Sequence, residues 1–334
     1  MVDKQTTPRL RLAYLDMTKG ILVILMVVYH SLNYTNQYHL GFRYLSFLPP
    51  SFILITGFLL STVYAPRYKA GDRRWVGRLL IRGIKLLALF TGLNIVAQFV
   101  RSPAYGQSVG VEEFFQQWQS VYLLGSGGFA AAFEVLLPIA YLLLLGPVLL
   151  ALAHQQSLFL TLVTASIVVI CAVLDHDGRA IANLNFLSAG VLGMLVGWFV
   201  PNPAMLGRYV WIPLLAYVGY FPLSVAKGYI YIVQLIGACV ALALICGLSL
   251  RFAAGGWWQQ RIMRIGQHSL LSYIVQIAIL QVLSRYIGRP PPLSADGLAL
   301  FLITLALTIL IVEFTEWIRN RSTGVEKLYK AVFA

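Results

Sequence analysis

The sequence consists largely of apolar stretches long enough to cross a lipid bilayer. A spanning helix needs about 20 predominantly apolar residues, and ten such stretches follow one another along the 334 residues. They cover residues 12–32, 46–64, 79–100, 128–152, 157–174, 181–200, 209–225, 228–250, 262–287 and 297–318. No polar linker longer than a loop interrupts them. We therefore predict an all-α, polytopic transmembrane helix bundle of about ten spans, forming a single domain over residues 1–334.

The composition excludes an ordinary soluble protein. Charged residues make up 11% of the chain and hydrophobic residues 59%, whereas a soluble domain carries about 25% charged residues. The net charge of +13 would point to nucleic acid in a soluble protein, but basic loops beside lipid headgroups explain it here. We expect membrane lipids as partners and no nucleic acid. The three cysteines lie in apolar stretches, which predicts buried thiols rather than metal ligands or disulfides: Cys171, Cys239 and Cys246.

Positive charge alternates between successive loops. The two termini and every second loop are basic, with Lys4, Arg9, Arg11, Arg67, Lys69, Arg73, Arg74, Arg78, His154, Arg208, Arg251, Arg261, Arg264, Arg319, Arg321, Lys327 and Lys330. The other loops mix fewer cations with acids: Arg43, Arg101, Glu112, Glu113, Asp175, Asp177, Arg179, Lys227, Arg285, Arg289 and Asp296. Because basic loops remain in the cytoplasm, both termini are predicted to be cytoplasmic. The chain is expected to be a multi-pass protein of the plasma (inner) membrane.

The first apolar stretch carries ionisable residues within the sequence LDMTKGILVILMVVYH, residues 15–30. The predicted orientation places Lys19 toward the cytoplasm. His30 follows eleven residues later, about 16 Å farther along a helix, near the outer mouth. His30 is either a functional imidazole or an interfacial side chain that reaches the headgroups.

Glu134 is the second ionisable residue in an unexpected place. It is expected about six residues inside the fourth span, also toward the outer side, where an ionisable group costs about 2.5–3.5 kcal/mol. Nothing on its own helix pairs with it. A partner on another helix is therefore expected, and His30 lies at similar depth. A carboxylate beside an imidazole would fix its tautomer and strengthen it as a base.

Further charged groups occur near both predicted surfaces. Arg78, Arg82 and Lys85 recur at helical spacing where the third span begins, which suits either cytoplasmic anchoring or binding of a phosphate-bearing ligand. Near the inner end of the last span, local ion pairing is the favoured interpretation of Glu313, Glu316 and Arg319. Polar residues at the outer mouth are candidates for binding a sugar, but short loops are usually polar without any binding role. The candidates are Asn33, Asp175, His176 and Arg179.

Several motifs resemble the acyltransferase-3 clan of integral membrane acyltransferases. Asp16, Gly20 and His30 fit the first-helix signature of the clan, with Lys19 in place of its arginine. PPSFILITGFLLSTVY, residues 49–64, resembles the second-helix motif. The segments AAFEVLLPIAYLLLL (131–145) and RIGQHSLLSYIVQIAIL (264–280) are similar to later parts of the clan, especially its periplasmic glucan succinyltransferase branch, with Gln276 where many members have histidine.

The resemblance implies an acyl-CoA-dependent membrane O-acyltransferase. Its donor would be acyl-CoA, with acetyl-CoA or succinyl-CoA as candidates, and it would need no metal or tightly bound cofactor. The acceptor would be a hydroxyl of an extracytoplasmic or membrane-bound glycan or glycolipid. His30 would act as general base or transient acyl carrier, with Glu134 and Asp16 as further catalytic candidates. The groups expected at the coenzyme A phosphates are Lys19, Arg78, Arg82 and Lys85.

A transporter or flippase for a polar lipid or sugar is the alternative function. Many spans, buried charges and polar outer loops fit that class as well. The sequence shows neither an internal repeat nor paired helices broken by Gly or Pro at matching positions. We therefore favour the enzyme, while the acceptor, the acyl group and the oligomeric state are not predicted.

Overall fold

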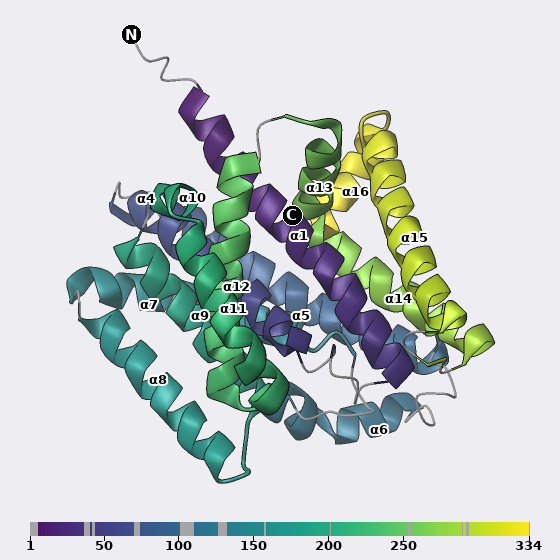
Figure 1. The fold of residues 1–334 in the computed structure, drawn as a ribbon, viewed down its shortest axis with the longest axis horizontal. Coiled ribbons are helices and arrows are strands. Elements are labelled where there is room, and N and C mark those ends of the chain that lie inside the picture. The colour runs from purple at the N-terminus through teal and green to yellow at the C-terminus, as the bar shows by residue number, and fades with distance from the viewer. Residues whose placement is uncertain are drawn as a thin grey trace. The chain divides into compact units, whose positions relative to one another are not determined.

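A computed structural model describes residues 6–36, 41, 44–69, 74–100, 110–125, 132–156, 158–200, 202–252, 255–288, 290–291 and 294–333. Every regular element within these ranges is a helix (Figure 1). This confirms the all-α prediction. The loop charges Lys4, Arg43, Arg73, Arg101 and Arg289 lie outside the described residues, and the orientation of the termini stays a prediction.

Nine stretches within the described chain are long and apolar enough to cross a membrane: Ala13–Thr35, Leu45–Tyr68, Arg74–Phe99, Leu136–Gln155, Phe159–His176, Ala182–Phe199, Tyr231–Phe252, Ser269–Ile287 and Ala295–Arg319. They correspond to nine of the ten expected spans. The remaining expected span, residues 209–225, coincides with α11 (Trp211–Lys227), a helix of 17 residues that contains Pro222. The chain is a multi-pass membrane protein.

The chain divides into two compact units, and each is described by itself. Unit 1 consists of Met1–Leu48, Asn202–Tyr229 and Ile236–Ala334. Its described helices are α1 (Thr6–Asn36), η1 (Leu45–Phe47), α10 (Ala204–Arg208), α11, most of α12 (Tyr231–Phe252), α13 (Trp257–Gln267), α14 (Ser269–Ile287), α15 (Ala295–Arg319) and α16 (Thr323–Phe333). The single domain expected over residues 1–334 stays a prediction.

In unit 1, α1 packs closely against α13 (Figure 1). A Cβ added at Gly20 of α1 would lie 2.0 Å from the carbonyl oxygen of Ile262, and one added at Gly266 of α13 would lie 1.8 Å from the carbonyl oxygen of Asp16. The two backbones therefore touch, which only small residues permit. This contact explains physically why a glycine follows Lys19 in the first-helix motif.

Unit 2 consists of Pro49–Pro201 and Ile230–Leu235. Its described helices are α3 (Leu48–Leu59, from Pro49 on), the π-helix η2 (Leu60–Tyr64), α4 (Ala65–Lys69), α5 (Arg74–Val100), α6 (Gly110–Gln116), the π-helix η4 (Gln119–Leu124), α7 (Leu136–Gln155), α8 (Phe159–His176) and α9 (Ala182–Phe199). A Cβ at Gly57 would lie 1.9 Å from the carbonyl oxygen of Gly190, so α3 and α9 also meet through their backbones.

Candidate active site

His30 lies in the last two turns of α1, a continuous helix of 31 residues. Its imidazole is half-buried and contacts two tyrosine rings, with centroids 5.4 Å from Tyr29 and 5.9 Å from Tyr273 of α14. Its Nε2 atom is buried and has no hydrogen-bond partner among the described residues. A buried ring nitrogen without a partner is rare in folded proteins. No described side chain therefore competes with a ligand for this nitrogen.

Asp16 does not lie beside His30. The two residues are fourteen positions apart on one helix, roughly 21 Å along its axis. The Asp16 carboxylate pairs with the ammonium of Lys19 at 2.8 Å and accepts a hydrogen bond from Gln267 Nε2 at 3.2 Å. Asp16 thus helps to join α1 to α13 and balances the Lys19 charge. This position gives it no route to the imidazole, so its predicted catalytic role stays without structural support.

Glu134 belongs to unit 2 and precedes a helix rather than lying inside one. We expected it about six residues into a span over residues 128–152, but α7 begins at Leu136 and Glu134 lies in a turn before it. The preceding residue, Phe133, is buried and has a φ of 61°, a left-handed conformation that non-glycine residues seldom adopt. This conformation ends any helical continuation toward the N-terminus. The expected location of Glu134 was therefore wrong.

Asn94 of α5 holds the segment that leads into Glu134. Its side chain is fully buried. Its Oδ1 accepts a hydrogen bond from the Ala132 N–H at 2.6 Å, and its Nδ2 donates to the Ala132 carbonyl at 2.9 Å and to the Phe90 carbonyl at 2.9 Å. One amide thereby satisfies both backbone groups of a residue next to the left-handed turn.

The Glu134 carboxylate forms no hydrogen bond or ion pair with another described residue. Burial raises the pKa of this carboxyl to about 7. A carboxyl with that pKa exchanges protons near neutral pH and suits acid–base chemistry. Its expected pairing with His30, which belongs to the other unit, stays a prediction.

The cationic candidates of α5 occupy one side of its first three turns. Arg78 and Arg82 are exposed and Lys85 is half-buried. Neither Arg78 nor Arg82 forms an ion pair within the described chain, so both guanidinium groups remain available to a phosphate. Lys19, by contrast, belongs to unit 1 and is already paired with Asp16.

The polar candidates at the predicted outer side divide into structural and exposed residues. Asp175 accepts a hydrogen bond at 3.0 Å from the backbone N–H of Tyr231, the first residue of α12, and so caps that helix. The His176 side chain is 90% exposed and lies 3.4 Å from Asp177. Arg179 is exposed and Asn33 is half-buried. Asp175 therefore has a structural role that the sequence prediction did not include.

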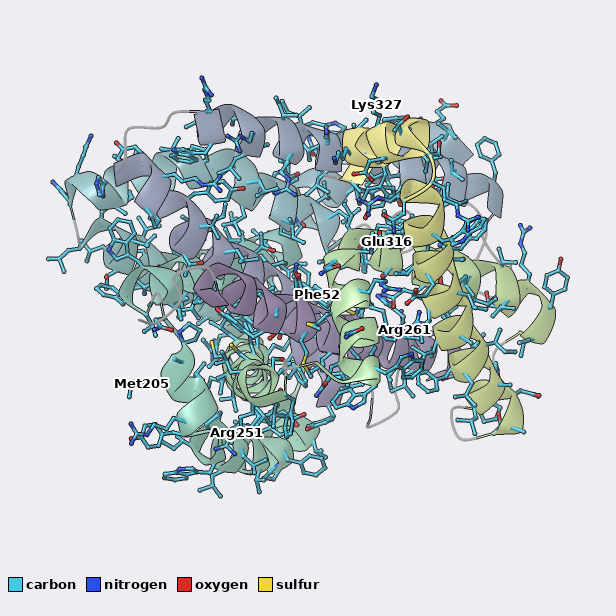
Figure 2. The ribbon with its side chains drawn as sticks, turned by 90° about the horizontal axis from the view of Figure 1, so that it is seen from above. Phe52, Met205, Arg251, Arg261, Glu316 and Lys327 are labelled. Atoms are coloured by element: carbon cyan, nitrogen blue, oxygen red, sulfur yellow. The ribbon has the colours of Figure 1, made fainter. Side chains whose placement is uncertain are left out.

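Local ion pairing is confirmed for Glu316, whereas Glu313 pairs with arginines of another helix. Glu316 pairs with Arg319 at 3.0 Å, and Glu313 pairs with Arg261 of α13 at 2.6 Å and with Arg264. Figure 2 marks Arg261 and Glu316 on the neighbouring helices α13 and α15. The two pairs of Glu313 join α15 to α13 in unit 1.

Two buried polar residues were missed as candidates. His268, between α13 and α14, is 3% exposed and hydrogen-bonds with Tyr329 of α16 at 2.6 Å and with Glu316 at 3.1 Å. Gln276 of α14 is fully buried, and neither its Oε1 nor its Nε2 has a hydrogen-bond partner in the described part of the chain. For Gln276, the available signal was a glutamine in the middle of an apolar stretch.

No group of three or more side chains suited to a metal ion occurs among the residues that the structure describes.

Comparison with known proteins gives one match. The acyltransferase-3 family model, described as an acyltransferase domain, matches residues 12–313 and so spans both units. No curated protein and no solved structure matches the chain. The match covers His30, Glu134 and the cations of α5, and it favours an enzyme over a transporter.

Proposed function

Because the chain belongs to the acyltransferase-3 family and is a membrane acyltransferase, we propose that it transfers an acyl group from cytoplasmic acyl-CoA to a hydroxyl. The acceptor is a glycan or glycolipid outside the cytoplasm or embedded in the membrane. The acyl group is small, with acetyl and succinyl as the candidates. The protein resides in the plasma (inner) membrane.

The observation that carries this proposal is the unpaired, buried Nε2 of His30. A general base needs a lone pair that no protein group occupies and a position close to the reacting hydroxyl. As base, His30 takes the proton of the acceptor hydroxyl while its oxygen attacks the thioester carbonyl. As acyl carrier, the same nitrogen attacks first and passes the acyl group on.

The exposed guanidinium groups of Arg78 and Arg82 support the choice of donor. Coenzyme A carries several phosphates, and the planar fork of arginine matches phosphate oxygens. Lys85 and Lys19 are further cations for this end of the donor. Glu134, whose pKa lies near neutrality, orients or charge-balances the reacting imidazole.

The test supplies membranes that contain the protein with acetyl-CoA or succinyl-CoA labelled in the acyl group. Label appearing in the glycan or lipid fraction, together with release of the coenzyme A thiol, is the expected result. His30→Ala should abolish both at an equal amount of inserted protein. His154→Ala is the matched control, because His154 of α7 makes edge-to-face contacts with Tyr68 and Trp198 in unit 2. Full transfer by the His30 variant would refute the assignment.

A further inference from the structure

Gln276 carries two buried polar atoms that the fold leaves unused. The side chain is fully buried in α14, and both amide atoms lack a hydrogen-bond partner within the residues that the structure describes. Leaving a buried amide unpaired destabilises the folded protein. A leucine of similar volume would avoid that penalty, so packing does not explain a glutamine here. A buried amide without partners is instead expected where the hydrogen-bonding partner is a ligand that is not bound.

The position of Gln276 relates it to His30. The buried face of α14 consists of Ser272, Tyr273, Gln276, Ile277, Leu280, Gln281 and Ser284. Tyr273, three residues before Gln276 and thus its neighbour on that face, contacts the His30 ring at 5.9 Å between centroids. Helices α1 and α14 pack together in unit 1. The pair of helices therefore carries a buried imidazole nitrogen and a buried amide, both without partners.

We propose that Gln276 is a catalytic residue whose Nε2–H donates a hydrogen bond to the carbonyl oxygen of the transferred acyl group. The inference rests on the proposed function, because the ligand is the thioester of that reaction. Its Oε1 is left to accept a hydrogen bond from the acceptor hydroxyl or from an amide of the donor. Gln276 thus supplies a neutral donor where the reaction develops negative charge.

The step balances with the groups present. The acceptor O–H gives its proton to His30 Nε2 while its oxygen bonds to the thioester carbonyl carbon. The carbonyl π electrons move onto oxygen, where the Gln276 N–H stabilises the charge. The carbonyl then re-forms, the C–S bond breaks, and the sulfur leaves as the coenzyme A thiol with the proton from His30. The products are the acyl ester and free coenzyme A.

Kinetics separate this role from a structural one. Gln276→Leu should lower kcat by about 10²–10³-fold, as loss of an oxyanion donor does, and leave the donor KM within about threefold. The apparent melting temperature should stay the same or rise, because the variant loses no hydrogen bond. Gln276→His, which retains an N–H donor, should recover part of kcat. Gln281→Leu, on the same face of α14, is the matched control and should keep full kcat.

Unchanged kcat in Gln276→Leu would overturn the inference. An equal loss of kcat in Gln281→Leu would also overturn it, because the effect would then belong to the packing of α14.

An infrared measurement separates the inference from the proposed function. Acetyl-CoA with a ¹³C-labelled carbonyl is bound to His30→Ala protein, in which no transfer occurs. The labelled carbonyl band should shift to lower frequency on binding to the His30→Ala protein. The shift should be absent in the double variant that carries both His30→Ala and Gln276→Leu. A bound donor whose band is unaffected by Gln276→Leu would overturn the inference and leave the proposed function standing. Failure of both the unchanged protein and His30→Ala to bind the donor would overturn the proposed function, and the inference with it.

Discussion

Asn94 holds both backbone groups of Ala132 with one side-chain amide, accepting from its N–H at 2.6 Å and donating to its carbonyl at 2.9 Å. Asn94→Ala would remove both hydrogen bonds from these half-buried groups and release the turn at Phe133. We expect a loss of roughly 2 kcal/mol or more in unfolding free energy, seen as a lower melting temperature in detergent. Gln155→Ala, at an exposed position in the last turn of α7, should leave it unchanged. Equal melting temperatures for both variants would contradict this account of the turn.

Gly20 is required by the contact between α1 and α13. In Gly20→Ala the new methyl group would meet the Ile262 carbonyl, so the helices must separate and lose packing. We expect several kcal/mol of destabilisation and a sharp fall in correctly inserted protein. Gly77→Ala in α5 is the control, since a Cβ there meets nothing within 4 Å, and its helix propensity should rise. The measurement is the yield of monodisperse protein after size-exclusion chromatography.

Arg82 is expected to act on donor binding. Arg82→Ala should raise the apparent KM for acyl-CoA by about tenfold, the loss of one charge-assisted hydrogen bond, with little change in kcat. Arg67→Ala is the matched control, because the Arg67 guanidinium lies 5.4 Å from the Tyr64 ring centroid and is interpreted as an anchor. A fall in kcat at unchanged KM would place Arg82 at the chemistry instead.

Glu134 predicts a specific pH dependence of stability. Its folded-state pKa of about 7 exceeds the ordinary value of 4.5, so the folded protein holds this proton more tightly than the unfolded chain. The stabilisation is complete below about pH 4.5 and is lost as the pH rises through 7. In Glu134→Gln this contribution should disappear. Melting temperatures at pH 5 and pH 7.5 measure it, and an identical slope in protein and variant would refute it.

His268 predicts the opposite pH dependence. Burial lowers the pKa of its imidazole, while Glu316 works against that shift and Arg319 and Arg264 reinforce it. Tyr329 is the remaining titratable neighbour. Because the unfolded chain binds the proton more readily, stability should fall as the pH drops through the ordinary histidine pKa of 6.5. His268→Gln should flatten this slope between pH 7.5 and 5.5, whereas His176→Gln, at an exposed side chain, should not.

The spans were predictable because hydropathy is a local property of the sequence. The start of α7 just after Glu134 was not predictable, because the sequence around it has the pattern of a continuous apolar helix. Its turn depends on Phe133 adopting a left-handed conformation and on Asn94, which is 38 residues away from Ala132. Pairing of Glu316 with Arg319 followed from helical spacing. The pairing of Glu313 with Arg261 and the unpaired state of Gln276 depend on helix packing, which no local pattern encodes.

Because α1 is continuous, a movement at its contact with α13 is transmitted to His30. The 31 residues of α1 form one uninterrupted rod, pinned to α13 by backbone contact at Gly20 and by the link from Asp16 to Gln267. His30 lies ten residues beyond the pin, about 15 Å along the rod. A tilt of a few degrees at the pinned end therefore displaces the imidazole by about an ångström. A change of tilt at the contact with α13 would therefore move the ring of His30, the proposed base.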